Sequence, residues 1–88
     1  MKIDVIKRDI IDITVTDHAI QIALELGVSH GRAKKTVTPM TIEHEVLIAG
    51  ILPGEQGDSI ADAIAMAVAG VNARADDAIA ALKGLSSL

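Results

Sequence analysis

The last third of the chain carries the pattern that most restricts the fold. Apolar residues recur there at spacings of three and four, which is an apolar heptad seam over residues 58–85. The members of the seam are Ala61, Ile64, Val68, Val71, Ala75, Ala78, Leu82 and Leu85. The pattern predicts one long amphipathic helix, capped by Asp58 or Ser59 and ending near Gly84. Ten of the fourteen alanines lie in this segment, so a neighbouring element can approach it closely.

Such a seam requires an apolar surface to pack against. The chain has 88 residues, a length at which a single core barely outweighs chain entropy and oligomerisation often supplies further burial. We therefore expect a homo-oligomer, and the alternative is that the helix packs on the sheet of its own chain. The residues expected at the contact between copies are Ile64, Val68, Val71, Ala75, Ala78 and Leu82.

The N-terminal region is rich in β-branched residues. Ile11, Ile13 and Val15 alternate with Asp12 and Thr14, which is the two-residue period of a half-buried strand. The sequence therefore predicts a strand region over residues 3–15, either one bent strand or two short ones.

Residues 16–37 have the spacing of a helix, a turn and a second helix. Thr16 or Asp17 can cap a first helix that runs to about Leu26. Gly27 fits the left-handed position at which helices commonly stop, and Ser29 can cap a second short helix.

Residues 38–52 fit two structures. Their first half alternates like a strand, whereas Thr38 followed by Pro39 is a helix-start signal. The apolar run that follows suits a buried strand or a buried helix, and the alternation favours a strand. Pro53 and Gly54 then open a predicted loop over residues 53–59.

The segment 19–37 resembles the helix-turn-helix DNA-binding motif. Ile22, Ala23 and Leu26 match its first helix, and Gly27 to Ser29 match its turn. In that family the second helix enters the major groove of double-stranded DNA. The residues that the resemblance implies to face DNA are His30, Arg32, Lys34 and Lys35.

Other short patterns favour no chemistry. Residues 27–31 match the G-x-S-x-G pattern of a nucleophile elbow, but a predicted helix precedes them and the chain is too short for a hydrolase sheet. None of the three histidines has a His or carboxylate four residues further on, as two metal ligands on one helix face would need. The loop over residues 53–59 lacks the lysine of a phosphate-binding loop. We expect no catalytic residue, cofactor or metal.

Composition narrows the classes of function further. The chain has no Phe, Tyr or Trp, so base stacking of the kind used by single-strand and RNA-reading modules is disfavoured. It has no cysteine, which suits a reducing compartment, and we expect a cytoplasmic protein without a membrane span. Net charge is −4, and residues 39–88 hold two basic against seven acidic residues.

The sequence thus predicts a single small α+β domain over residues 1–88. Its expected order is an N-terminal strand region, a helix-turn-helix pair, a central strand or buried helix, and a long C-terminal amphipathic helix. The first functional hypothesis is a non-enzymatic homo-oligomeric structural or assembly protein, for example a subunit of a multimeric particle. The alternative is a DNA-binding module that dimerises through its C-terminal helix. An enzyme with sites shared between subunits stays open.

Overall fold

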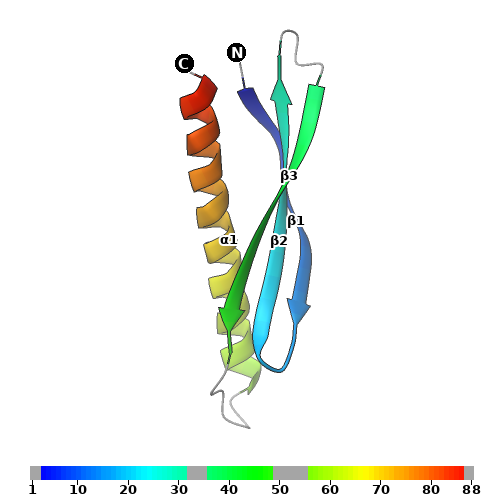
Figure 1. The fold of residues 1–88 in the computed structure, drawn as a ribbon. Helices are drawn as coiled ribbons and strands as arrows, with labels where there is room; N and C mark the ends of the chain where they lie inside the picture. The colour runs from blue at the N-terminus through cyan, green and yellow to red at the C-terminus, as the bar shows by residue number, and fades with distance from the viewer. Residues whose placement is uncertain (1–2, 32–35, 49–55, 87–88) are drawn as a thin grey trace.

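The protein is a three-stranded antiparallel sheet with one long helix packed on it (Figure 1). A computed structural model describes residues 3–31, 36–48 and 56–86. The elements in chain order are β1 (Ile3–Val15), β2 (Ala19–His30), β3 (Thr36–Leu47) and α1 (Gln56–Ser86). The expected α+β class is confirmed, as are the N-terminal strand, the central strand and the long C-terminal helix.

Strand β2 is the centre of the sheet, and its neighbours in sequence are also its neighbours in space. Ile22 of β2 lies opposite Ile13 of β1 and His44 of β3. The pairing of β1 is interrupted twice, between Val5 and Lys7 and between Ile10 and Asp12. The N-terminal region is therefore one bent strand, because a β-bulge bends the strand that contains it.

The predicted helix-turn-helix pair is wrong, since residues 19–30 form β2 and residues 36–47 form β3. The apolar side chains of β2 satisfy a period of two as well as a helical spacing. They are Ile20, Ile22, Leu24, Leu26 and Val28, all buried. Residues 19–30 form a strand and not a helix because β1 and β3 supply backbone hydrogen bonds along both sides of β2 and α1 covers its apolar face.

Thr16 caps a hairpin turn and not a helix. Its Oγ1 accepts from the backbone N–H of Ala19 at 3.1 Å and of His18 at 3.3 Å, and its own N–H donates to the Ala19 carbonyl at 2.9 Å. The sequence identified the capping chemistry but assigned it to the wrong element. Gly27, expected to end a helix, lies within β2, and the left-handed conformation belongs to Gly31 with φ of +90°.

Helix α1 has 31 residues, which corresponds to about 46 Å of length. It begins before Asp58 and Ser59 and continues past Gly84, so both predicted ends were misplaced by about one turn or less. The residues expected as a loop at 56–59 belong to its first turn, and those at 53–55 lie outside the described residues. The expected alternative of a buried helix also extended over 49–52, which the structure does not describe.

The helix crosses the sheet obliquely (Figure 1). Its N-terminal half lies over β3, and its C-terminal half lies beside the start of β1. Ile3 and Val5 at the start of β1 consequently pack against the core, together with Met40, Ile42 and Val46 of β3. The second half of β1 runs away from the helix and is left without that cover.

The molecule is long and thin. Its dimensions are 55 × 20 × 15 Å and its radius of gyration is 16.4 Å. A compact domain of 88 residues would have a radius of about 12 Å. The long strands and the long helix α1 therefore spread a small core over a large surface.

Candidate functional site

The two faces of the sheet differ in chemistry. The face under α1 carries the buried apolar residues of β2, while Gln21, Ala23 and Glu25 point to the opposite face because side chains alternate along a strand. Along Gln21, Ala23 and Glu25, none of the described elements covers that opposite face, whereas Ser29 near the end of β2 is buried. We call it the open face.

The open face is strongly acidic. The pairing register places on it the carboxylates of Asp4, Asp9, Asp12, Glu25, Glu43 and Glu45. Among the described residues its one ammonium group is that of Lys7, which lies opposite Gly27. Like charges at this density repel a second acidic surface and attract cations or basic partners.

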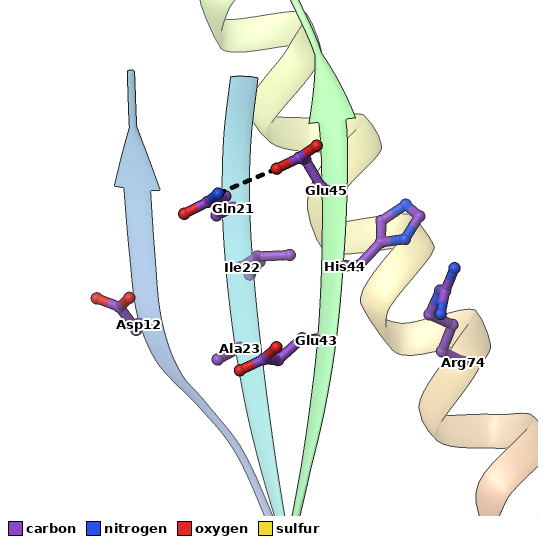
Figure 2. Close-up of a pocket in the computed structure, with 8 residues that line it drawn as sticks. All are labelled: Asp12, Gln21, Ile22, Ala23, Glu43, His44, Glu45 and Arg74. Carbon is purple, nitrogen blue, oxygen red and sulfur yellow. Dashed lines mark hydrogen bonds between the residues drawn. The ribbon is translucent and has the colours of Figure 1, made fainter. Parts of the chain in front are cut away.

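A shallow pocket of about 350 Å³ lies at the first half of β2 and the second half of β3 (Figure 2). On the open face, Ala23 lies between Asp12 of β1 and Glu43 of β3 in one row across the sheet, and its small side chain leaves a hollow there. Gln21 Nε2 donates to Glu45 Oε2 at 3.0 Å. The lining also includes Ile22, His44 and Arg74, which lie on the helix side of the sheet in Figure 2.

On the open face, the carboxylates of this pocket favour a hydrogen-bond donor or a cation over an anion, while Arg74 lines the pocket on the helix side. They do not make a metal site, because no three His, Cys, Asp or Glu side chains of the described residues lie close enough together to hold a metal ion. The pocket combines carboxylates with an amide that already bonds one of them. Its lining residues include no Ser, Thr, Cys or Lys.

Lys7 and Glu25 form the ion pair of the open face. Lys7 Nζ donates to Glu25 Oε1 at 2.8 Å. This hydrogen bond, and then the charge of Glu25, raise the pKa of Lys7 above its ordinary value of 10.5. The pair lies at the bulge opposite Gly27, where a Cβ would come within 2.9 Å of Lys7 Cβ. Glycine is therefore needed at residue 27 for the close passage of β1.

His44 has a packing role on the helix side of β3. Its ring lies against Gly70 of α1, and a Cβ at residue 70 would collide with that ring. Its Nδ1 is buried without a hydrogen-bond partner. Gly70 thus sets how closely the helix approaches β3.

Arg8 holds the helix on the other side. Its Nη1 donates to Asp76 Oδ1 at 2.8 Å, and its Nη2 donates to Asn72 Oδ1 at 2.9 Å and to the Asn72 carbonyl at 3.1 Å. These contacts attach the middle of α1 to the middle of β1. Arg8 is an ordered structural contact, not a basic group free to bind phosphate.

Beyond Arg8, β1 exposes apolar side chains on the helix-facing side. Ile10, Ile13 and Val15 lie opposite the buried Leu24, Ile22 and Ile20. They are nevertheless 39%, 44% and 47% exposed, because α1 lies over the other strands at this level. We call Ile10, Ile13 and Val15 the β1 shelf.

Uncharged residues of α1 lie along the side of the helix that faces the β1 shelf. Asn72 touches Arg8, so the side of α1 that looks toward β1 passes through Asn72 and, at helical spacing, Val68, Ala65 and Ala61. Val68 is partly buried against the core, and both alanines are exposed. No charged residue of α1 stands at these four positions.

Of the residues predicted to bind DNA, the structure describes His30, which lies in a strand and not in a recognition helix. His30 is the last residue of β2, and its Nε2 lies 3.0 Å from Thr38 Oγ1. Arg32, Lys34 and Lys35 lie outside the described residues. Ser29, the serine of the G-x-S-x-G pattern, lies within β2 and is 1% exposed, so no nucleophile elbow is present there.

The seam residues predicted for oligomerisation pack within the chain. Val71 and Ala75 are fully buried against the sheet. The rest, Ile64, Val68, Ala78 and Leu82, are partly buried against the same core. The alternative expectation, that the helix packs on its own sheet, describes this arrangement.

Sequence reasoning did not single out the β1 shelf or the pocket at Ala23. The alternation of residues 11–15 marked the strand, but it did not show that a helix would leave these residues uncovered. A signal for the pocket exists only in the pairing of Asp12, Ala23 and Glu43, which depends on the register of three strands.

Comparison with protein-family models, with curated proteins and with solved structures gives no match. Within the described part of the chain, α1 is the one helix, and it is not apolar enough to cross a membrane.

Proposed function

We propose that this chain is a non-enzymatic structural or assembly protein that works as a homo-oligomer, for example as a subunit of a multimeric particle. The observation that carries the proposal is the β1 shelf, where core-facing side chains of the sheet are left uncovered. Exposed apolar residues that gather on one strand are typical of interaction sites. We include a cytoplasmic location in the proposal, as the cysteine-free sequence suggests.

The total surface supports the same proposal. The chain exposes 5834 Å², whereas a compact monomer of its 9.1 kDa mass would expose about 4,900 Å². The excess is of the size that one partner contributes to an ordinary protein interface, about 800 Å². An elongated subunit with a small core gains most by burying such surface against a neighbour.

Charge indicates which surface stays free. Stacking the open faces of two copies would bring Glu43, Glu45 and Asp12 against the same carboxylates. Each such contact would be repulsive and would desolvate charged groups. The open face and its pocket are therefore available to a basic partner, while copies of the chain meet elsewhere.

A DNA-binding module remains the second candidate, in a different geometry from the predicted one. His30 lies opposite Thr36 at the end of the β2–β3 hairpin, and Arg32, Lys34 and Lys35 belong to the connection between those two residues. A two-stranded antiparallel ribbon has the dimensions to enter the major groove. This basic connection is what favours double-stranded DNA as a partner.

The experiment that tests both candidates is the native mass by light scattering, over a wide range of protein concentration. It is run with and without a mixed-sequence DNA fragment at about 50 mM salt, where phosphate contacts are strongest. The assembly proposal expects an oligomer whose mass DNA does not change. A monomer at every concentration contradicts it, and a mass that rises with DNA and falls again with salt favours the second candidate.

A further inference from the structure

Strand β1 is an edge of the sheet that is open to pairing. Its inner side pairs with β2, and none of the described strands pairs with its outer side. A free edge presents a row of backbone N–H and C=O groups to another chain. The apolar side chains of its second half, which include the β1 shelf, make this edge unusually suited to association.

The opposite edge of the sheet is less suited to pairing. Pro39 lies in β3 and has no backbone N–H, so it interrupts the hydrogen-bonding row of that edge. Glu43 and Glu45 follow it on the same strand. Proline and charged residues are the devices by which edges resist pairing.

We propose that a second copy of this chain covers the β1 shelf, with the C-terminal halves of the two β1 strands paired antiparallel about a two-fold axis at Ile13. This inference rests on the proposed self-assembly and names its contact. The two sheets join into one of six strands. Since the axis is perpendicular to the sheet, both helices lie on the same face, and the two shelves form one apolar floor between them.

The charges along β1 are compatible with this axis and disfavour axes at the charged residues. With the axis at Ile13, Asp12 of each strand faces Thr14 of the other, and no two carboxylates oppose each other over residues 11–15. An axis at Arg8 would place Arg8 against Arg8, and an axis at Asp9 would place Asp9 against Asp9. Like charges directly opposite each other on a sheet are destabilising.

Local geometry favours the same segment. Both bulges of β1 lie before Asp12, so Asp12–Val15 pairs with β2 without interruption. Regular pairing on the inner side leaves the N–H and C=O groups of every second residue directed to the outer side, where a partner strand can bond them. The contacts of Arg8 with α1 and of Lys7 with Glu25 lie outside the paired segment and stay intact.

Disulfide cross-linking tests the position of the axis. The chain has no cysteine of its own, so only the introduced cysteines can form a disulfide. In Ile13→Cys, the two Cα atoms directly opposite each other would lie about 4.5–5.5 Å apart, which a disulfide can span. We expect mild oxidation at low micromolar concentration to convert most of this variant into covalent dimer. Thr41→Cys, exposed on the open face of β3, is the matched control and should give at least tenfold less dimer.

The register has its own test. Asp12→Cys and Thr14→Cys should each cross-link poorly alone and efficiently when mixed, since these residues face each other across the axis. Circular dichroism checks that every variant is folded. If native masses show an oligomer but Ile13→Cys cross-links no better than Thr41→Cys, this inference is wrong and the proposed function stands. If the protein is monomeric at all concentrations, both are wrong.

Discussion

The two halves of β1 have similar apolar side chains but opposite environments. Ile3 and Val5 pack against the core beside α1, whereas Ile13 and Val15 on the same side of the sheet are nearly half exposed. Val28 and Ile22, which lie opposite Val5 and Ile13, are equally apolar and both buried. The difference comes from the oblique path of the helix. Burial in this protein is therefore decided by tertiary packing and not by the local pattern.

The largest difference between the covered and the uncovered region is expected when a carboxylate is introduced into each of them. Val71 is fully buried on α1. Val71→Asp should unfold the chain, because burying an unpaired charge lowers the free energy of unfolding by more than about 4 kcal/mol. Val15→Asp on the β1 shelf should leave the fold of the single chain intact and weaken only the proposed contact between copies. Thermal unfolding followed by circular dichroism measures both variants, and equal destabilisation by the two would contradict the described path of the helix.

The sequence predicted the C-terminal helix and the N-terminal strand because their patterns admit one period only. Residues 11–15 alternate strictly, and the seam of α1 keeps spacings of three and four over its length. Residues 19–28 admit two periods: Ile20, Leu24 and Val28 lie four apart, and with Ile22 and Leu26 they also lie two apart. Whether these residues form a helix or a strand depends on pairing with β1 and β3. The pattern within residues 19–28 alone does not contain that information.

The candidate site was less predictable than the fold. The seam was correctly identified as a packing surface, but the sequence could not tell its own sheet from another copy as the partner. The β1 shelf depends on the angle at which α1 crosses the sheet. That angle depends in turn on two details, the contact of Gly70 with His44 and the contacts of Arg8, and neither has a sequence signature.

A substitution at Gly70 tests how closely the helix approaches β3, because the missing side chain of Gly70 leaves room for the His44 ring. In Gly70→Ala, the gain in helix propensity of about 1 kcal/mol should be outweighed by the collision with the His44 ring, for a net loss of about 1–3 kcal/mol. Gly84→Ala is the control in the same helix, since a Cβ there meets nothing within 4 Å. It should stabilise the chain.

Urea denaturation measures both glycine variants. His44→Ala in the Gly70→Ala background should recover most of the lost stability, because it removes the colliding ring. A Gly70→Ala variant as stable as Gly84→Ala would show that the helix does not approach β3 as closely as described.

Arg8 separates the covered half of β1 from the uncovered half. Arg8→Met keeps the apolar stem but removes three hydrogen bonds to α1. Because Asp76 is mostly exposed, we expect a modest loss of about 0.5–1.5 kcal/mol. Hydrogen exchange should locate the loosening at the β1 edge beside α1. Protection unchanged near Ile10 would mean that Arg8 does not hold the helix there.

The smallest effect belongs to the open face, where Lys7 and Glu25 pair in solvent. Glu25 raises the pKa of Lys7 in the folded chain above 10.5, the value expected when unfolded. The stabilisation is thus fully present below that pH and is lost as pH rises through the folded-state pKa. Wild type should unfold at a slightly higher temperature than Glu25→Gln at pH 8, and the difference should vanish well above pH 10.5. A difference that persists there would have to come from packing of the Glu25 side chain. The polar open face would then contribute to the fold in the same way as the face under α1.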